Sequence, residues 1–233
     1  MKKDENLKEF VTRSHKKSLK NRKEYFLKNT KVFIKDPLPN NIDMPLVLNK
    51  VEKTLPGEYI NLIDIIYVGN FDTFEERGVN ALYSDGALFI TNSQSDNSDL
   101  LDDMIHEISH ALEESYANEI YGDDKIEIEF IAKRIRLESI LRNEGYDTSQ
   151  QDFSNLDWNS EFDDFLNKEI GYVMLNTLSR GLFVSAYGAT SLREYFANCF
   201  EEYYIGDKKY LQTISPSVYN TLSNLEDLTR QND

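Results

Sequence analysis

Two of the three histidines in this 233-residue chain lie four residues apart, in the sequence His106-Glu107-Ile108-Ser109-His110. The surrounding residues 98–117 have helical periodicity, because apolar side chains recur at intervals of three and four positions and fall on one stripe. These apolar residues are Leu101, Met104, Ile105, Ile108 and Leu112. The two histidines lie on the other side of the predicted helix, one turn apart, so both imidazoles can reach one point in space.

This spacing suits a catalytic zinc site. Zinc takes imidazole or carboxylate ligands in a tetrahedral arrangement, and a catalytic site leaves the fourth position to water. Glu107, which directly follows the first histidine, is then placed to accept a proton from that water. We therefore predict His106 and His110 as zinc ligands and Glu107 as general base. The alternative is a solvated polar helix face that carries two imidazoles without a metal.

A third ligand is expected to be a carboxylate, because the remaining histidine, His15, lies far away in the N-terminal segment. The stretch "SLREYFANCFEEYY" has an apolar stripe on one side and a polar face on the other, as the first helix has. The polar face carries Glu194, Asn198 and Glu201. Periodicity alone does not choose between Glu194 and Glu201.

The rest of the chain predicts an α+β fold that is mostly α, with one or two hairpins ahead of a helical half. A strand is expected within residues 62–70. The best hairpin signal is "ALYSDGALFITN", where two apolar runs flank an Asp85-Gly86 turn. Helices are expected over 44–56, 98–117, 124–145, 161–181 and 191–206, with a last one from near Pro216. Residues 146–160 are expected to be a loop, with Trp158 as a possible anchor.

The charge is unevenly distributed along the chain. Residues 1–35 carry 12 Lys or Arg and 4 Asp or Glu, whereas residues 36–233 carry 14 and 37. We therefore predict a basic, helical arm over residues 1–40 and a separate acidic domain over residues 41–233. The arm is either a solvated amphipathic helix or a contact for nucleic acid or another acidic partner. Nucleic acid is not expected on the acidic body, which would instead favour substrates with Lys or Arg near the cleaved bond.

Other features bear on location. No window approaches the roughly 18 apolar residues that a membrane span needs. The start "MKKDENLKEF" has lysines without an apolar segment behind them, which argues against a signal peptide. Cys199 is the one cysteine, so no internal disulfide is expected. The expected location is cytoplasmic, injected into another cell, or virion-associated, rather than classically secreted.

Several ordered motifs together resemble one family. "HEISHALEE", followed by Tyr187-Gly188 and then by Glu194-Tyr195-Phe196-Ala197, is similar to the HExxH zinc peptidase domain of the anthrax lethal factor family, which includes the Pro-Pro endopeptidases. The hairpin region also resembles the family's strand pair ahead of the helix, and "SPSVYNTLSNL" its closing helix. The likeness covers about residues 60–233.

The resemblance implies a zincin-like fold, in which a small sheet packs on the HExxH helix and a helical lobe follows. It implies that Glu194 is the third zinc ligand and that Tyr187 stabilises the transition state. It also implies that the strand around Gly86 to Ile90 is the edge to which an extended peptide adds, with Gly86, Ala87, Leu88 and Phe89 binding substrate.

Two features depart from the family pattern. A second glutamate that the family often places four residues after the ligand is Asn198 here, so support for a ligand histidine is expected to differ. His110 and Glu194 are also far apart in sequence, which suggests a helical and loop insertion over about residues 120–165. That insertion would restrict the cleft or bind a partner.

Together these observations predict a zinc-dependent endopeptidase of the gluzincin type, related to a toxin family, with one catalytic Zn²⁺. Its partner would be a protein or peptide substrate. The alternative is a catalytically silent protein that keeps the zincin fold as a binding or virion structural component. The discriminating experiment is zinc content and cleavage in the wild type and in Glu107→Gln.

Overall fold

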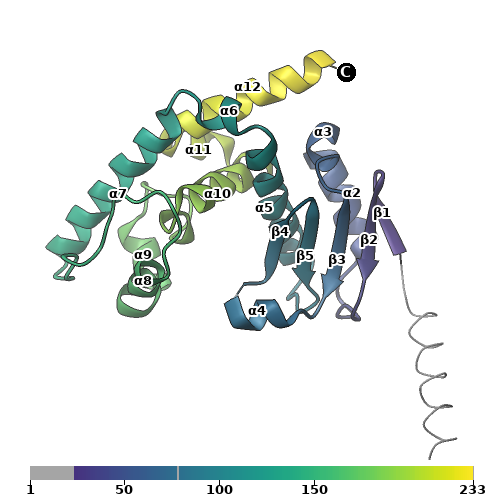
Figure 1. Ribbon diagram of the computed structural model, residues 1–233, viewed down its shortest axis with the longest axis horizontal. Helices are drawn as coiled ribbons and strands as arrows, with labels where there is room; N and C mark the ends of the chain where they lie inside the picture. Colours follow the sequence, from purple (N-terminus) through teal and green to yellow (C-terminus); the bar gives the residue numbers. More distant parts are fainter. Residues whose placement is uncertain (1–23, 78, 233) are drawn as a thin grey trace, which may run out of the picture.

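The computed structural model describes residues 24–77 and 79–232, and it contains a five-stranded mixed sheet with helices around it (Figure 1). The strand order is β1-β2-β3-β5-β4. β2, β3 and β5 are parallel to one another, whereas β1 and β4 are antiparallel to their neighbours and form the two edges. The strands span Glu24–Leu27 (β1), Thr30–Ile34 (β2), Ile65–Gly69 (β3), Ala81–Ser84 (β4) and Ala87–Thr91 (β5).

The hairpin predicted around residues 81–92 is confirmed. β4 and β5 are joined by Asp85 and Gly86, whose φ angles of 48° and 79° are both positive. Such a two-residue turn matches the twist of the flanking strands. Asp85 tolerates the left-handed region better than most residues with a Cβ, and glycine adopts it without steric cost.

The helix predicted over residues 1–40 is wrong for residues 24–34, which form the hairpin of β1 and β2. Leu27 and Val32 are fully buried, so this lysine-containing segment belongs to the sheet and its core. Lys31 lies between the buried Thr30 and Val32 of β2, so the lysine-rich composition of the segment masks its alternation of buried and less buried residues. Residues 1–23 of the expected arm lie outside the described residues.

Helices cover one face of the sheet and build the remaining half of the molecule (Figure 1). In the first half they are α2 (Met44–Thr54), α3 (Gly57–Ile60), α4 (Asp72–Arg77), α5 (Asn97–Ser115) and α6 (Ala117–Tyr121). The second half has α7 (Lys125–Asn143), α8 (Ser160–Asp164), a π turn (η1, Phe165–Ile170), α9 (Tyr172–Leu178), a 3₁₀ turn (η2, Tyr187–Ala189), α10 (Leu192–Ile205), α11 (Lys208–Ile214) and α12 (Pro216–Asn232). The predicted α+β, mostly helical class is confirmed.

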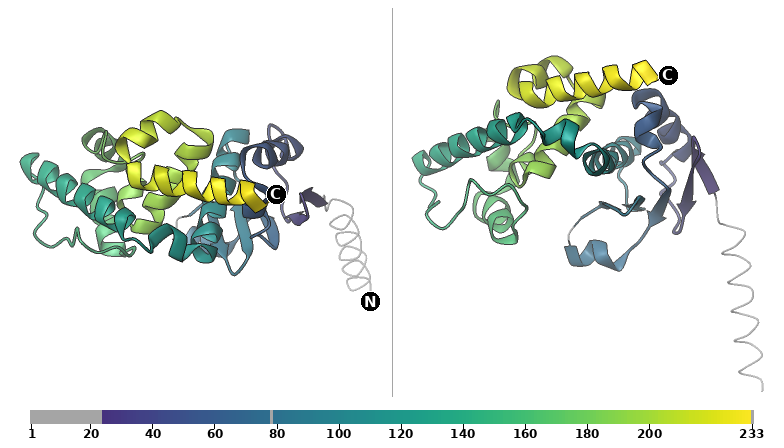
Figure 2. Two further views of the ribbon diagram at one scale, coloured as in Figure 1. Left: turned by 90° about the horizontal axis from the view of Figure 1, so that it is seen from above. Right: turned by 45° about the horizontal axis from the view of Figure 1, so that its top comes forward.

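α5 lies between the sheet and α10 (Figure 1), and α12 runs along the top of the molecule to end above α3 in the right view of Figure 2. One side of α5 packs against α2, β4 and β5, and another side packs against α10. This central place explains why its apolar stripe is almost completely buried, from Leu101 to Leu112. Among the described residues, no helix is both long enough and apolar enough to cross a bilayer.

The single helix predicted over residues 161–181 is broken into α8, the π turn and α9. Gly171, with a φ of 81°, ends the π turn and redirects the chain into α9. A π turn shifts the residues that follow it around the helix axis. In α9, Val173 is 88% exposed while Leu175, two residues later and on the opposite side of the helix, is fully buried.

The loop over residues 146–160 is confirmed, but its predicted anchor is wrong. Trp158 is 55% exposed. The buried guanidinium of Arg134 holds this loop instead, donating to the carbonyl oxygens of Asn155 at 2.5 Å and Asp152 at 3.0 Å. The same guanidinium stacks over the Phe162 ring, 4.0 Å from its centroid.

α7 lies in the segment predicted as an insertion, and it is part of the core of the helical half. Its Phe130 and Leu137 are fully buried. Lys133 Nζ donates to the carbonyl oxygens of Leu182 at 2.7 Å and Ile214 at 2.6 Å, and to Ser215 Oγ at 2.8 Å. This buried ammonium therefore joins α7 to the end of α11 and to the segment between α9 and η2.

Candidate metal centre

The helix α5 presents the two histidines and Glu107. The helix begins at Asn97, and Asp96 caps it by accepting from the N–H groups of Ser98 at 2.6 Å and Asp99 at 3.2 Å. The face that carries the histidines is not solvated, because α10 lies across it. Glu107 and His110 are each only 7% exposed.

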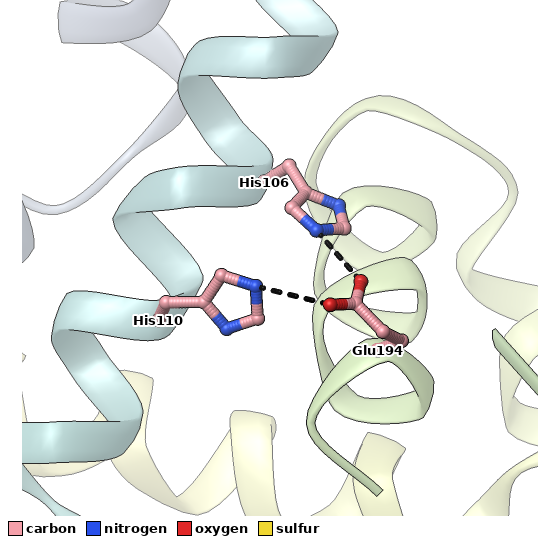
Figure 3. Close-up of side chains that lie close together, drawn as sticks. All are labelled: His106, His110 and Glu194. Carbon is pink, nitrogen blue, oxygen red and sulfur yellow. Dashed lines mark hydrogen bonds and ion pairs between the residues drawn. The ribbon is translucent and has the colours of Figure 1, made fainter. Parts of the chain in front are cut away.

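Glu194, in the first turn of α10, points between the two imidazoles (Figure 3). Its Oε2 lies 3.1 Å from Nε2 of His106, and its Oε1 lies 3.9 Å from Nε2 of His110. One ligand atom from each of the three side chains lies within 4.8 Å of the others. Ser191 caps α10 by accepting from the N–H of Glu194, which fixes the start of the helix.

The structure thus distinguishes the two carboxylates that periodicity left open. Glu194 joins the histidines as a potential metal ligand, whereas Glu201 hydrogen-bonds Nδ1 of His106 on the far side of the ring. On His110 the corresponding position is taken by Glu113, whose Oε2 lies 2.8 Å from Nδ1. Each histidine therefore has its Nδ1 held by a carboxylate and its Nε2 directed towards Glu194.

This arrangement fits a metal ion. Metal-binding histidines commonly hydrogen-bond a carboxylate through the ring nitrogen that does not face the metal, which fixes the tautomer and the ring orientation. Two imidazoles and one carboxylate are also donors that borderline divalent cations accept. The group His106, His110 and Glu194 could therefore hold a metal ion, as the sequence predicted for the two histidines and the resemblance implied for Glu194.

Burial and neighbouring charges shift the pKa values of the side chains in the metal-free site. Burial opposes a charge on His106, but hydrogen bonds to Glu194 and Glu201 outweigh it and raise the pKa of His106 well above its ordinary value. Burial and, to a smaller extent, the neighbouring His106 lower the pKa of His110 to about 3, although Glu194 acts in the opposite direction. Burial also opposes the charge of Glu194, yet contact with His106 leaves its pKa lowered. The carboxylates thus stabilise positive charge where a cation would bind.

Glu107 lies beside this group and is buried. Its Oε2 accepts the main-chain N–H of Tyr83 at 2.6 Å. Burial raises the pKa of Glu107 to about 7, although the charge of His106 acts in the opposite direction. A carboxyl group with such a pKa can both accept and release a proton near neutral pH.

Tyr187 lies in η2, a 3₁₀ turn that packs against α10. Its ring is 6.2 Å from the Tyr172 ring in an edge-to-face arrangement, and the Tyr172 hydroxyl donates to Oδ1 of Asp163 at 2.5 Å. The turn is also tied to α10 through Asn198. Ser185 Oγ donates to Oδ1 of Asn198, whose Nδ2 donates to the Glu194 carbonyl at 2.9 Å.

Asn198 therefore contacts the main chain of Glu194 and neither of the two histidines. Asn198 stands where the family often has a glutamate that supports a histidine, but here it connects Glu194 to the turn that carries Tyr187. The carboxylates that contact the histidines are those of Glu201 and Glu113. The sequence pattern offered Glu201 only as an alternative ligand, and it did not single out Glu113. The available signal was helical spacing, because Glu113 follows His110 by three residues and Glu201 follows Glu194 by seven.

The predicted substrate strand is not at the edge of the sheet. Gly86 lies in the turn, and Ala87, Leu88 and Phe89 lie in β5, which is paired on both sides by β3 and β4. Leu88 is fully buried. The edge is β4, one strand earlier, and this strand packs against α5. The prediction failed because a hairpin pattern does not show which of its two strands pairs with the rest of the sheet.

Comparison of the chain with protein-family models, with curated proteins and with solved structures found no match.

Proposed function

We propose that this protein is a zinc-dependent endopeptidase. The observation that carries the proposal is the meeting of His106, His110 and Glu194 within 4.8 Å, with the buried carboxyl of Glu107 directly beside them. The similarity of the ordered motifs to the lethal factor family supports the same conclusion. A metal-free polar face would not require three separate carboxylates to contact two imidazoles.

The donor set favours zinc among the biological cations. Imidazole nitrogen is a poor ligand for magnesium and calcium, which prefer oxygen. Two histidines and one glutamate are the protein ligands of a familiar class of zinc peptidase centres, which leave a position open. Zinc bound there would act as a Lewis acid and lower the pKa of water towards neutrality.

The chain's own residues would then carry the proton transfers. Glu107 would accept the proton of the attacking water and pass it to the nitrogen of the departing amine, for which its raised pKa is suited. Tyr187 would donate a hydrogen bond to the oxygen that develops negative charge. Its turn is fixed to the main chain of Glu194 through Asn198, so its position is coupled to that of the third ligand.

An extended peptide would add to β4 as a sixth strand, in place of the predicted addition to β5. β4 is an edge strand with outward main-chain groups, and strand addition is a common mode of peptide recognition. The excess of acidic residues outside positions 1–35 favours peptides with Lys or Arg near the cut. Cleavage of a basic peptide should then weaken with added salt more steeply than that of a neutral one.

The deciding experiment measures zinc content and cleavage of a mixed peptide library, read by mass spectrometry. The wild type should bind one equivalent of zinc and cut, whereas Glu107→Gln should bind zinc without cutting. Glu107→Gln keeps the shape and an acceptor oxygen but removes the base. His106→Gln should lose zinc, and His15→Gln, which alters the one histidine outside the HExxH sequence, should behave as the wild type.

Zinc bound by both wild type and Glu107→Gln, with cleavage by neither, would support the alternative of a silent zincin-fold binding protein. An absence of zinc from the wild type would refute both. Cleavage that persists in Glu107→Gln would show that another group acts as the base.

A further inference from the structure

The edge strand β4 makes a main-chain contact with the candidate general base. The N–H of Tyr83 donates to Oε2 of Glu107 at 2.6 Å, across a separation of 24 residues. Glu107 is 7% exposed, so this contact is shielded from bulk water. A charge-assisted hydrogen bond of this kind is shorter and stronger than one between neutral groups.

The register of the hairpin explains why this N–H is available. Ser84 and Ala87 flank the two-residue turn, and the Thr91 N–H donates to the Asn80 carbonyl at 2.8 Å. Residues 80, 82 and 84 therefore exchange hydrogen bonds with β5, and the main-chain groups of Ala81 and Tyr83 point away from it. An outward N–H on an edge strand ordinarily faces solvent, but that of Tyr83 faces α5.

We propose that the Tyr83 main-chain N–H positions the carboxylate of Glu107 for proton transfer, which makes β4 a positioning element of the reaction as well as the edge for an added peptide. This inference rests on the endopeptidase function proposed above. The N–H holds Oε2 and leaves Oε1 to meet the attacking water. Because the N–H is already engaged, a peptide added to β4 pairs through Ala81 and through the carbonyl of Tyr83.

The first test observes the hydrogen bond itself and requires no activity. Amide hydrogen exchange is measured by NMR at Tyr83 and Ala81 in the metal-free protein. The Tyr83 amide should exchange slowly in the wild type and in Glu107→Gln, whose amide oxygen still accepts. It should exchange at least tenfold faster in Glu107→Ala. The Ala81 amide, on the same outward side, should exchange rapidly in all three proteins.

The second test removes the donor without touching Glu107. Proline is tolerated on an edge strand where the N–H does not pair with the neighbouring strand, so Tyr83→Pro should fold and bind zinc with unchanged affinity. Tyr83→Ala loses the phenol but keeps the N–H. The kcat of Tyr83→Pro should be at least tenfold below that of Tyr83→Ala, with similar KM. Ala81→Pro should instead raise KM and leave kcat within a factor of three.

The outcomes separate this inference from the proposed function. If the wild type binds zinc but cleaves no peptide, the endopeptidase proposal fails and the positioning role falls with it. If the wild type cleaves but Tyr83→Pro and Tyr83→Ala have equal kcat, the inference alone is wrong. Equal exchange of the Tyr83 amide in wild type and Glu107→Ala overturns it even if Tyr83→Pro does not fold.

Discussion

Nδ1 of His110 lies 2.8 Å from Oε2 of Glu113, one turn further along the same helix. Glu113 is itself only 5% exposed, and it also accepts the hydroxyl of Tyr121 and lies 3.6 Å from Nε of Arg193. A buried carboxylate with three partners is a fixed acceptor. It therefore holds the imidazole with Nε2 turned towards Glu194, which is the orientation that metal binding requires.

The first prediction follows from this contact. Glu113→Gln should weaken zinc binding 10–100-fold, because the amide orients the ring less strongly and no longer increases its basicity. Competition with a chromophoric chelator measures the affinity. Glu114→Gln, at the exposed neighbouring position, is the matched control and should retain wild-type affinity. Equal zinc affinities in the two variants would mean that Glu113 contributes to folding but not to zinc binding.

The second prediction distinguishes the two glutamates of α10. Glu194→Gln removes a charged ligand and should reduce zinc affinity by more than 100-fold. Glu201→Gln keeps all three ligands and alters only the partner of His106 Nδ1, so its loss should stay within 10–100-fold. Both affinities are measured by the same chelator competition. A larger loss in Glu201→Gln than in Glu194→Gln would reverse the assignment of the third ligand.

Much of the site could be predicted because its geometry is local. His106, Glu107 and His110 lie within five residues of one helix, so helical spacing alone sets their relative positions. Spacing says nothing about what covers a helix face. Glu107 is buried beside Tyr83 of β4, and His110 is buried against Glu194 of α10, which is more than 80 residues away in sequence. The shifted pKa values of both groups follow from this burial.

The errors in the fold have a similar origin. The Asp85-Gly86 turn has its own sequence signal, but the choice of β4 over β5 as the edge is made by pairing with β3. The sequence does not predict the β1–β2 hairpin because both strands are short and lie in a lysine-rich segment, and their burial depends on β3 and α2. Long-range pairing overrides local composition at both places.

The third prediction concerns stability and α7. Lys133→Met keeps the apolar stem but removes the ammonium, which donates hydrogen bonds to three oxygens. The carbonyls of Leu182 and Ile214 then lose a buried donor. The free energy of unfolding should fall by about 3 kcal/mol, measured by urea denaturation. Lys125→Met, at an exposed position on the same helix, should change it by less than about 0.5 kcal/mol. A Lys133→Met variant as stable as the wild type would show that the buried ammonium is not required to hold α7 against the rest of the helical half.

The last prediction uses the single thiol of the chain. Cys199 is fully buried in α10, and burial raises the pKa of its thiol to about 12. The thiolate is the form that reacts with alkylating agents. At pH 8 alkylation should be blocked because little of the thiol is ionised and because the sulfur is not accessible to the reagent. Labelling with iodoacetamide should therefore be negligible in the native protein and become complete in denaturant, with a rate that follows global unfolding.

Because α10 also carries Glu194, zinc should slow labelling further by stabilising the folded state. Rapid labelling of the native, zinc-loaded protein would show that α10 opens locally, which would be inconsistent with a rigid third ligand.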